Sequence, residues 1–517
     1  MTTSDQPAID DPFDEVTIRI FTRRKFMAVT GGAIGAVILA ACGSDKKAVE
    51  TTAAAEPETT AAAAVSETTA VAAAAETTAA ATASETTAAG AAETTAAAAA
   101  SETTAAAAPA GGTNAAKFGG GGGDGTLKIG FTVPLTGPLG GFGEANEFIL
   151  KGINELTKDG LMIGGKSYKV DILQRDVQSN SDTAAQQAGK LITDDGVDLM
   201  LAIATPEMIN PAADQCEANG VPCLSTLAPW QPYFFGRKGD PAKGFDWTYH
   251  FFWGADQLVG NFVDMWNTVP NNKKVGILCP NDPDGNALAD PKTGFPAGAT
   301  AAGYEVVDPG RFQTGSDDFS AIIGQFKDAG VEVVTGIPIP PDFATFWQQA
   351  SQQGFKPKLV TMAKAILFPS AVEALGDLGD GLASEIWWTP THPFKSSLTG
   401  TTSQELADAY TASTSKQWTQ FVGFVHALFE VCFDVVSRAG STDKKAIAAA
   451  AGSTNLNTIV GPIAYGKNGL PKNISPTSLV GGQWQKQKGK KYPFEIVVTN
   501  NKLSPQIPIG GELKALG

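Results

Sequence analysis

The sequence beyond residue 125 predicts an α/β fold with two lobes, each a parallel sheet flanked by helices. Short apolar segments alternate with longer amphipathic ones, which is typical of parallel strands joined by helices. Polar turns follow most of the apolar segments, where the carboxyl ends of the strands should lie. This part of the chain, about 390 residues, exceeds what one hydrophobic core normally holds, so two lobes are expected.

Residues 1–42 are expected to be an export signal. Arg23 and Arg24 precede an apolar run at residues 27–41, and Cys42 follows it. The run of ~15 residues is shorter than the ~20 that cross a bilayer as a helix, which favours a signal peptide over an uncleaved anchor. Thr-Arg-Arg-Lys-Phe-Met resembles the twin-arginine signal, and Leu39-Ala40-Ala41-Cys42 resembles a bacterial lipobox. We therefore expect lipidation of Cys42 and a position at the outer face of the cytoplasmic membrane, on the cell surface or in the periplasm.

Residues 43–125 are expected to be a disordered spacer. Glu-Thr-Thr recurs every eight or nine residues among alanines, and no apolar stripe is available to bury. Without a core, such a segment stays solvated. The glycines in "KFGGGGGDG" are interpreted as a hinge, since the patterns of nucleotide-binding loops are absent.

Charge and motif content exclude several functions. The net charge is −15, and eight glutamates within residues 48–116 supply about half of it. The acidic remainder argues against nucleic acid as a partner, because phosphate binding needs a basic face. The sequence contains neither G-x-S-x-G nor H-E-x-x-H, no C-x-x-C and only three histidines, so no enzyme active site, cofactor or metal site is expected.

Four cysteines lie in the exported part of the chain: Cys216, Cys223, Cys279 and Cys432. Cys216 lies near the end of a helical segment and Cys223 opens a strand, with a turn between them. A local disulfide and two separate buried thiols are both compatible with this spacing, and export to an oxidising compartment permits the disulfide.

The expected elements follow one another in a regular order. Strands are predicted at residues 127–134, 168–176, 197–204, 221–226, 274–280, 304–312, 331–338, 356–363 and 384–390. Helices are predicted at residues 144–160, 181–196, 210–220, 317–330 and 342–354. Seven polar turns at strand ends predict a ligand cleft lined from both lobes, the first being the glycine-rich turn at residues 135–143.

Several segments resemble the Leu/Ile/Val-binding proteins, the branched-chain amino-acid branch of the type I periplasmic binding proteins. The resemblance begins with "IGFTVPLTGPLGGFGEANEFILKGINELTKDG" and covers essentially residues 126–500. Further matches are "FQTGSDDFSAIIGQFKDAGVEVV", "GFVHALFEVCFDVVSRAGSTDKKAIAAA" and "VGPIAYGKNGLPKNISPTSLVGGQWQ".

The resemblance implies a substrate-binding domain at residues 126–517 that serves the permease of an ATP-driven (ABC) importer. Lobe 1 would combine residues 126–250 and 391–470, and lobe 2 residues 251–390 and 471–517. Three crossovers near His250, Thr389 and Leu470 would form the hinge, and ligand would drive closure. A sensor of the same fold is the alternative, although receptors normally add a signalling domain.

The resemblance also assigns ligand-binding positions. Phe142 matches a position that often carries tyrosine, so it packs on a ligand without a hydroxyl. Thr205, Ser225 and Thr226, with the backbone before Ala228, match the groups that hold a carboxylate.

The position that binds the ligand's ammonium group in amino-acid binders carries a different residue in this chain. Amino-acid binders place an acid after the strand that here ends at Met362, but this chain continues Ala363-Lys364. Asp284 is the candidate replacement. Lys364 either points into the cleft, where it would favour an anion and repel an ammonium, or solvates the rim.

Tryptophans complete the expected site. Trp230 follows one of the polar turns. Of Trp387 and Trp388, one should face the cleft because neighbouring strand residues face opposite ways, and we expect it to be Trp388. With Lys364, these rings favour an aromatic or larger carboxylate, or an amide, over leucine.

Overall fold

The structure is a computed structural model of the whole chain, and it describes residues 111–517. The predicted export signal, the lipidation at Cys42 and most of the predicted spacer lie outside the described residues.

Lobe 1 is built on a seven-stranded sheet of order β15-β6-β5-β4-β1-β3-β2. All neighbours are parallel except the edge pair β2–β3. The strands are β1 (Gly125–Val133), β2 (Leu161–Ile163), β3 (Lys166–Asp176), β4 (Leu199–Ile203), β5 (Cys223–Thr226), β6 (Thr248–Phe251) and β15 (Ile474–Ser475).

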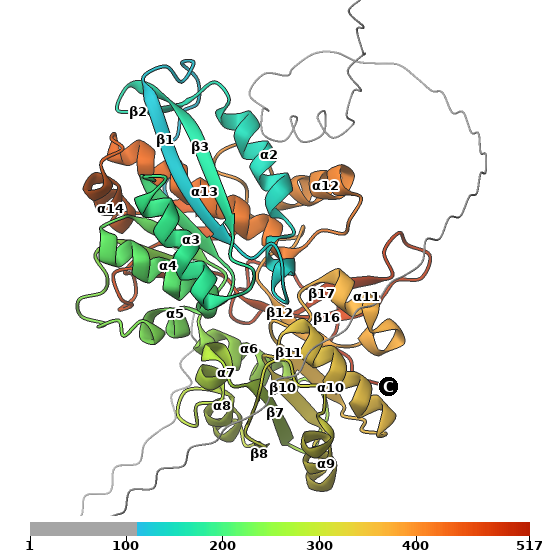
Figure 1. Cartoon of the computed structure of the whole chain (residues 1–517). Helices are drawn as coiled ribbons and strands as arrows, with labels where there is room; N and C mark the ends of the chain where they lie inside the picture. The colour runs from blue at the N-terminus through green and yellow to red at the C-terminus, as the bar shows by residue number, and fades with distance from the viewer. Residues whose placement is uncertain (1–110) are drawn as a thin grey trace, which may run out of the picture. The chain divides into compact units, whose positions relative to one another are not determined.

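Helices cover both faces of this sheet (Figure 1). One face packs on α3 (Ser181–Thr193), α4 (Pro206–Asn219) and α5 (Trp230–Gly236). The other face packs on α2 (Asn146–Thr157), α13 (Gln420–Ala439) and α14 (Lys444–Gly452), with α12 (Ser403–Thr414) beside α13. Since strand residues alternate between the faces, Met200 and Ala202 join the first cluster and Leu199, Leu201 and Ile203 the second.

Lobe 2 contains an eight-stranded sheet whose main path is β17-β16-β12-β11-β10-β7-β8, with β9 paired to β7. The strands are β7 (Lys274–Pro280), β8 (Glu305–Val307), β9 (Arg311–Phe312), β10 (Val333–Gly336), β11 (Leu359–Met362), β12 (Ala383–Ile386), β16 (Val480–Lys486) and β17 (Phe494–Asn500). The order from β8 to β12 is parallel, whereas β16 and β17 add antiparallel strands.

The helices of lobe 2 also form two layers. Helices α9 (Ser320–Ala329) and α10 (Pro340–Gln352) share one core with Val334 and Val360, and α6 (Ala255–Trp266) and α8 (Phe295–Ala301) share the other with Val275 and Val333. Shorter elements are α7 (Pro283–Leu288), α11 (Pro369–Ala374), the 3-10 turns η2 (Gly140–Gly143) and η3 (Gly376–Gly379), and the hairpin β13 (Asn455–Thr458)–β14 (Gly461–Ala464).

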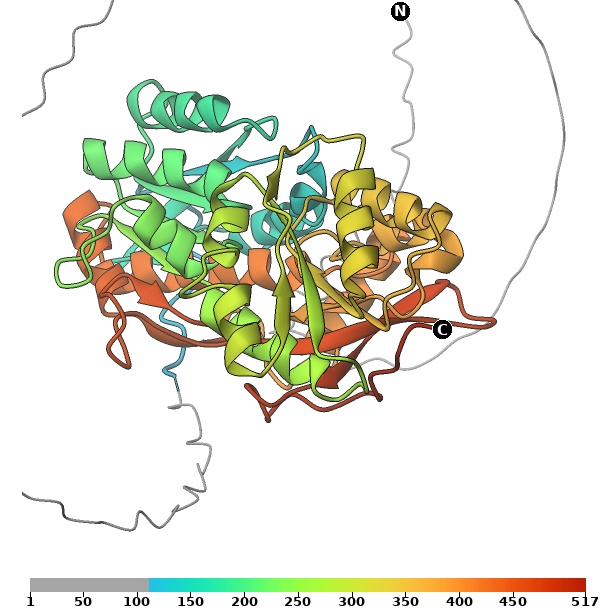
Figure 2. The same ribbon diagram turned by 90° about the horizontal axis from the view of Figure 1, so that it is seen from below.

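The chain crosses between the sheets three times, as predicted. It leaves lobe 1 after β6, returns after β12, and leaves again between β15 and β16. The red C-terminal part of the chain runs from one lobe to the other in Figure 2. Because β15 pairs with β6, the third crossing follows Ser475 rather than lying near Leu470.

Helix α13 is the central core element of lobe 1. Every residue from Gln420 to Val436 is buried. Of the helices in residues 111–517, it alone is long and apolar enough to cross a membrane, but its apolar surface packs inside the lobe.

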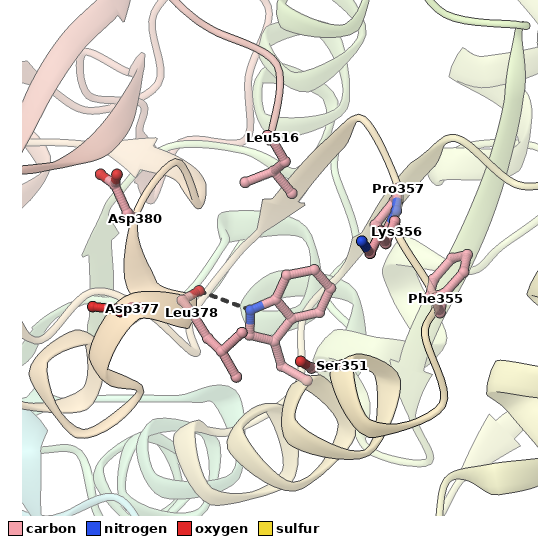
Figure 3. Close-up of a pocket in the computed structure, with 10 residues that line it drawn as sticks. Ser351, Phe355, Lys356, Pro357, Asp377, Leu378, Asp380 and Leu516 are labelled. Atoms are coloured by element: carbon pink, nitrogen blue, oxygen red, sulfur yellow. Dashed lines mark hydrogen bonds between the residues drawn. The ribbon is translucent and has the colours of Figure 1, made fainter.

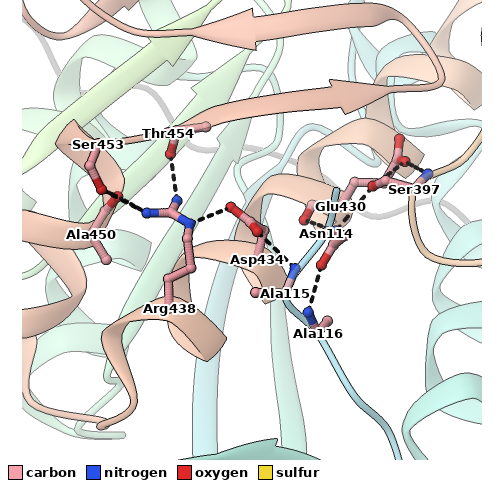
Figure 4. A network of polar contacts seen from close by, with 10 residues as sticks. All are labelled: Asn114, Ala115, Ala116, Ser397, Glu430, Asp434, Arg438, Ala450, Ser453 and Thr454. Atoms are coloured by element: carbon pink, nitrogen blue, oxygen red, sulfur yellow. Dashed lines mark hydrogen bonds and ion pairs between the residues drawn. The ribbon is translucent and has the colours of Figure 1, made fainter. Parts of the chain in front are cut away.

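Residues 111–124, here called the N-terminal strap, are packed on lobe 1 (Figure 4). Asn114 Nδ2 donates to Ser397 Oγ and to the Glu430 carbonyl, and the Ala115 N–H donates to Asp434. Phe118 meets the Phe433 ring edge-on at 5.7 Å.

The glycines of the strap adopt a specific conformation. Gly119, Gly120, Gly121 and Gly122 all have positive φ, which glycine adopts without strain. The turn they form bonds to Asp159, Gly160 and Ser167. The glycine-rich segment is therefore a packed strap rather than the expected hinge.

Candidate functional site

The cleft lies where the carboxyl ends of strands from both sheets meet, and it contains two adjoining chambers. An inner chamber of about 20 Å³ is the size of about one water molecule. Its walls are Phe142, Thr205, Leu227, Pro229, Phe252, Trp253, Asp284, Ile337, Lys364, Leu367, Glu385 and Trp387. An outer chamber of about 240 Å³ is lined by Pro138, Leu139, Ser179, Thr205, Glu207, Met208, Asp282, Thr314, Ile339 and Lys364. Thr205 and Lys364 border both chambers.

The glycine-rich turn at residues 135–143 brings the lobes together. Phe142 is buried, and its ring contacts Phe421 of α13 at 4.9 Å and Phe368 of lobe 2 at 5.6 Å. A Cβ on Gly141 would lie 2.8 Å from the Phe368 ring, so the close approach requires glycine. The turn holds an aromatic side chain against the inner chamber.

Besides Trp387 Nε1, which faces the Glu385 carboxylate, three buried polar atoms on the inner-chamber wall have no hydrogen-bond partner among the described residues. They are Thr205 Oγ1, Trp253 Nε1 and Asp284 Oδ1, and each residue is at most 2 % exposed. Thr205 is the N-cap of α4, yet its hydroxyl makes no capping bond. Such groups normally find a partner, because burying them unpaired costs about 1–3 kcal/mol each. They come from both lobes and the hinge, as expected for groups that close around a solute.

Lys364 lies between the chambers rather than at the rim. It is 5 % exposed, and its Nζ lies 3.1 Å from Asp284 Oδ2 and 3.3 Å from Asp282 Oδ2. Burial lowers the pKa of Lys364, but Asp284, Asp282 and Glu207 together raise it above its usual value. Burial raises the pKa of Asp284 to about 7, although Lys364 acts in the opposite direction. Both predicted residues thus line the cleft, but as partners of each other.

Glu385 is a cleft residue that the sequence analysis missed. Its Oε1 accepts the Lys364 backbone N–H at 3.1 Å, and its Oε2 accepts the Ser384 hydroxyl at 2.8 Å. Burial raises its pKa to about 7. It holds Lys364 in a left-handed backbone conformation, with φ of 64°. The signal in the sequence was an acid inside the apolar segment "SEIWW", at the carboxyl end of a strand.

Ser225, Thr226 and Ala228 do not line the cleft, contrary to prediction. Ala228 O accepts the Nε2–H of His250 at 2.7 Å, so Nδ1 of this neutral ring accepts from Ser225 Oγ at 2.9 Å. Burial lowers the pKa of His250 to about 3. Thr226 Oγ1 donates to the Phe251 carbonyl at 2.6 Å. Strand β5 is central, so both its faces are covered and its hydroxyls bond to β6; Leu227 and Pro229 line the chamber instead.

The predicted tryptophans are also placed differently. Trp387 lines the inner chamber, and its Nε1 lies near the Glu385 carboxylate without ordinary hydrogen-bond geometry. Trp388 points the other way and donates to Ser403 Oγ at 3.1 Å, so the predicted alternation holds but the choice of Trp388 is wrong. Trp230 is the first residue of α5 and is partly buried. Its ring contacts the Phe235 ring, and it is not among the residues that line the inner chamber. Trp253 from the first crossover was missed.

The cysteines of the described part are free. Cys216 and Cys223 are both buried, in contact and unbonded, so the disulfide alternative is wrong here and the separate thiols are found. Each packs in the core between α4 and the sheet.

A second cavity, of about 290 Å³, lies in lobe 2 away from the cleft (Figure 3). It is bounded by Phe355, Pro357, Leu378 and Leu516, and Trp347 Nε1 donates to the Leu378 carbonyl. Its walls come from lobe 2 alone, so lobe closure would not enclose a solute there.

Comparisons with known proteins find relatives in sequence and in fold. The family described as Periplasmic binding protein matches residues 126–480. A leucine-, isoleucine-, valine-, threonine- and alanine-binding protein of Pseudomonas aeruginosa is 24 % identical over 68 % of this chain and 89 % of its own length. A Leu/Ile/Val-binding protein homolog of Brucella melitensis is 24 % identical over 66 % and 88 %.

Solved structures show the same fold. A leucine-binding protein of Thermotoga maritima superposes with a TM-score of 0.59 at 19 % identity, over 73 % of this chain and 99 % of that one. A solute-binding protein of Rhodopseudomonas palustris in complex with 3,4-dihydroxybenzoic acid gives 0.57 at 18 % identity, over 72 % and 98 %.

Proposed function

Since the chain belongs to the periplasmic binding protein family, whose members bind solutes, we propose that it captures a small solute by lobe closure and delivers it to an ABC importer. The proposed ligand class is an amino acid or a related small carboxylate or amide. The protein would act outside the cytoplasm, anchored to the membrane by lipid on Cys42.

The observation that carries the proposal is the convergence of unpaired buried polar atoms from both lobes on one chamber. Thr205 belongs to lobe 1, Asp284 to lobe 2 and Trp253 to the hinge. A solute that pairs these atoms is bound better by the closed state than by the open one, and this difference in affinity drives closure.

The surrounding wall suits an apolar or aromatic body. Phe142, Leu227, Phe252 and Trp253 present carbon surface to the inner chamber. Pockets of this kind gain affinity from the apolar wall and orientation from a few polar groups.

A thermal-shift panel tests the proposal. The panel contains aliphatic and aromatic amino acids, the corresponding carboxylates, and the corresponding amides. A solute at 100 times its Kd should add about 2.7 kcal/mol to the free energy of unfolding. The proposal fails if no solute raises the melting temperature, or if the same shift occurs in a variant with Thr205→Val and Asp284→Asn.

Lipid anchoring needs a separate test. Cells that express the chain should retain it in the membrane fraction, and the variant Cys42→Ser should release it. Equal membrane retention of the unmodified chain and the Cys42→Ser variant would contradict lipid anchoring and would leave the solute-binding proposal unaffected.

A further inference from the structure

The acidic corner of the cleft already contains an ammonium. Lys364 Nζ lies within 3.3 Å of both Asp282 and Asp284, and the Glu385 carboxylate holds the Lys364 backbone N–H. The lysine is 5 % exposed. Its charge is therefore directed at carboxylates of the protein itself.

Carboxylates outnumber this lysine. Glu207 reaches the outer chamber from lobe 1, and its Oε2 is buried without a hydrogen bond among the described residues. Glu385 lines the inner chamber. Lys364 thus offers no free positive charge to an anionic ligand, and the cleft as a whole disfavours a carboxylate.

The unpaired atoms define what remains to be recognised. Trp253 Nε1–H needs an acceptor, Asp284 Oδ1 needs a donor, and the Thr205 hydroxyl serves as either. A carboxamide supplies both a carbonyl oxygen and N–H donors while remaining neutral. An ammonium placed beside Lys364 Nζ would face a like charge, and a carboxylate would find no free cation, because Lys364 is already paired with Asp282 and Asp284.

We propose that Lys364 is a specificity-determining residue that fills the acidic corner and excludes ammonium-bearing solutes, so that the ligand is a small neutral carboxamide with an apolar body. The carbon body lies along the aromatic wall and extends toward the outer chamber of about 240 Å³. This inference rests on the proposed solute-binding function and narrows it.

Four solutes of one carbon skeleton test the inference on the unmodified chain. Isothermal titration calorimetry at neutral pH compares isocaproamide, isocaproate, leucine and leucinamide, and hydrocinnamamide, hydrocinnamate, phenylalanine and phenylalaninamide form a parallel aromatic series. In at least one series the neutral amide should bind about tenfold tighter or more than its three relatives, the selectivity expected when a charge has no partner. Tighter binding of an amino acid or an ammonium-bearing amide overturns the inference, as does failure of both neutral amides.

A lysine variant tests the role of Lys364 itself. Lys364→Met leaves Asp284 and Asp282 without their cation, so leucinamide or phenylalaninamide should gain about tenfold in affinity while the neutral amide changes little. Adding Asp284→Asn should abolish that gain, and this double variant also removes the more buried of the two unpaired charges if the single variant folds poorly. Lys358→Met is the matched control, because it breaks a pair with Glu332 outside the cleft and should leave the preference unchanged.

The outcomes separate the two proposals. If an ammonium-bearing solute is bound best by the unmodified chain, solute binding stands and the role of Lys364 is refuted. If no solute in either series or in the broad thermal-shift panel binds, the proposed function itself fails.

Discussion

At the scale of single residues, hydrogen-bond satisfaction separates the groups that build the fold from those left for a ligand. Ser225 and Thr226 sit at the end of a strand that faces the cleft, yet both hydroxyls bond within the core. Thr205 follows the end of the neighbouring strand β4 as the N-cap of α4, and its hydroxyl bonds to nothing in residues 111–517.

Replacing Thr205 tests this distinction. Thr205→Val removes a hydroxyl that stabilises nothing in the closed protein, so stability should change little, while ligand affinity should fall by about 1 kcal/mol, or roughly fivefold. Calorimetric titration measures the affinity, and thermal unfolding without solute measures the stability.

Ser225→Ala is the matched comparison. It leaves His250 Nδ1 without its donor, so it should lower stability by about 1–3 kcal/mol without changing affinity. The reverse pattern, in which Ser225→Ala weakens binding and Thr205→Val does not, would contradict the assignment.

Glu385 predicts a pH dependence of stability. Its pKa rises from the ordinary 4.5 to about 7 on folding, so its contribution to stability is fully present below about pH 4.5 and is lost as the pH rises through about 7. Glu385→Gln keeps the acceptor for Lys364 N–H and removes the ionisation. Between these pH values the wild type should lose more stability than the variant, by on the order of 3 kcal/mol. Denaturant unfolding across the range measures the difference, and parallel curves would refute the assignment.

The site residues differ in how well sequence reasoning places them. Phe142, Thr205, Asp284 and Lys364 lie in the turns and helix starts that follow strands, so the parallel fold puts them near the cleft. The orientation of the last strand residues depends on strand register and on neighbours such as His250, which sequence patterns do not reveal. Trp387 and Trp388 illustrate this: the sequence predicts that they face opposite ways, but not which of them faces the cleft.

At the scale of elements, the turns after the strands decide how closely the lobes approach. Alternation of apolar and amphipathic segments predicted β1, β3, β4, β5, β7, β10, β11 and β12, because a doubly covered parallel sheet needs that pattern. The predicted strand at residues 304–312 forms two short strands, β8 and β9, and the prediction did not include β6 or the antiparallel β16 and β17. The strap escaped prediction because a glycine-rich segment with no net charge also fits a flexible linker. Its packing depends on partners such as Asn457 and Asp434, more than 300 residues away.

The close contact between Gly141 and Phe368 can be tested as a requirement for lobe closure. In Gly141→Ala the new methyl group would meet the Phe368 ring at 2.8 Å, so closure should be hindered and affinity should fall about tenfold, or 1.4 kcal/mol. Gly324→Ala is the control, because that helical position has open space and alanine favours a helix. Unchanged affinity in Gly141→Ala would show that the lobes do not close on this contact.

The N-terminal strap should contribute to stability. A chain that starts at residue 126 loses the bonds of Asn114, Ala115 and the glycine turn together with the burial of Phe118, at a cost on the order of 3 kcal/mol relative to one that starts at 111. Urea unfolding of both chains measures this cost. Asn114→Ala in the longer chain should show a smaller part of the loss, and equal stability of all three would mean that the strap is not docked in solution.

At the scale of the whole molecule, three crossovers connect two sheets whose strand ends meet at the cleft. Helix α7 of lobe 2 packs against α4 and α5 of lobe 1, so the structure represents lobes in contact. The space of about 20 Å³ left in the inner chamber is too small for most solutes, and entry therefore requires the lobes to separate.

The central claim is that a solute is held between the lobes by the polar atoms that the protein leaves unpaired. The most direct measurement is a crystal structure of the protein with the solute that gives the largest thermal shift. The account predicts that the solute lies in the inner chamber and extends toward the outer one, within hydrogen-bond distance of at least two of Thr205 Oγ1, Trp253 Nε1 and Asp284 Oδ1. A solute bound elsewhere, such as in the lobe 2 cavity beside Trp347, or a closed cleft in which these three atoms stay unpaired, would contradict it.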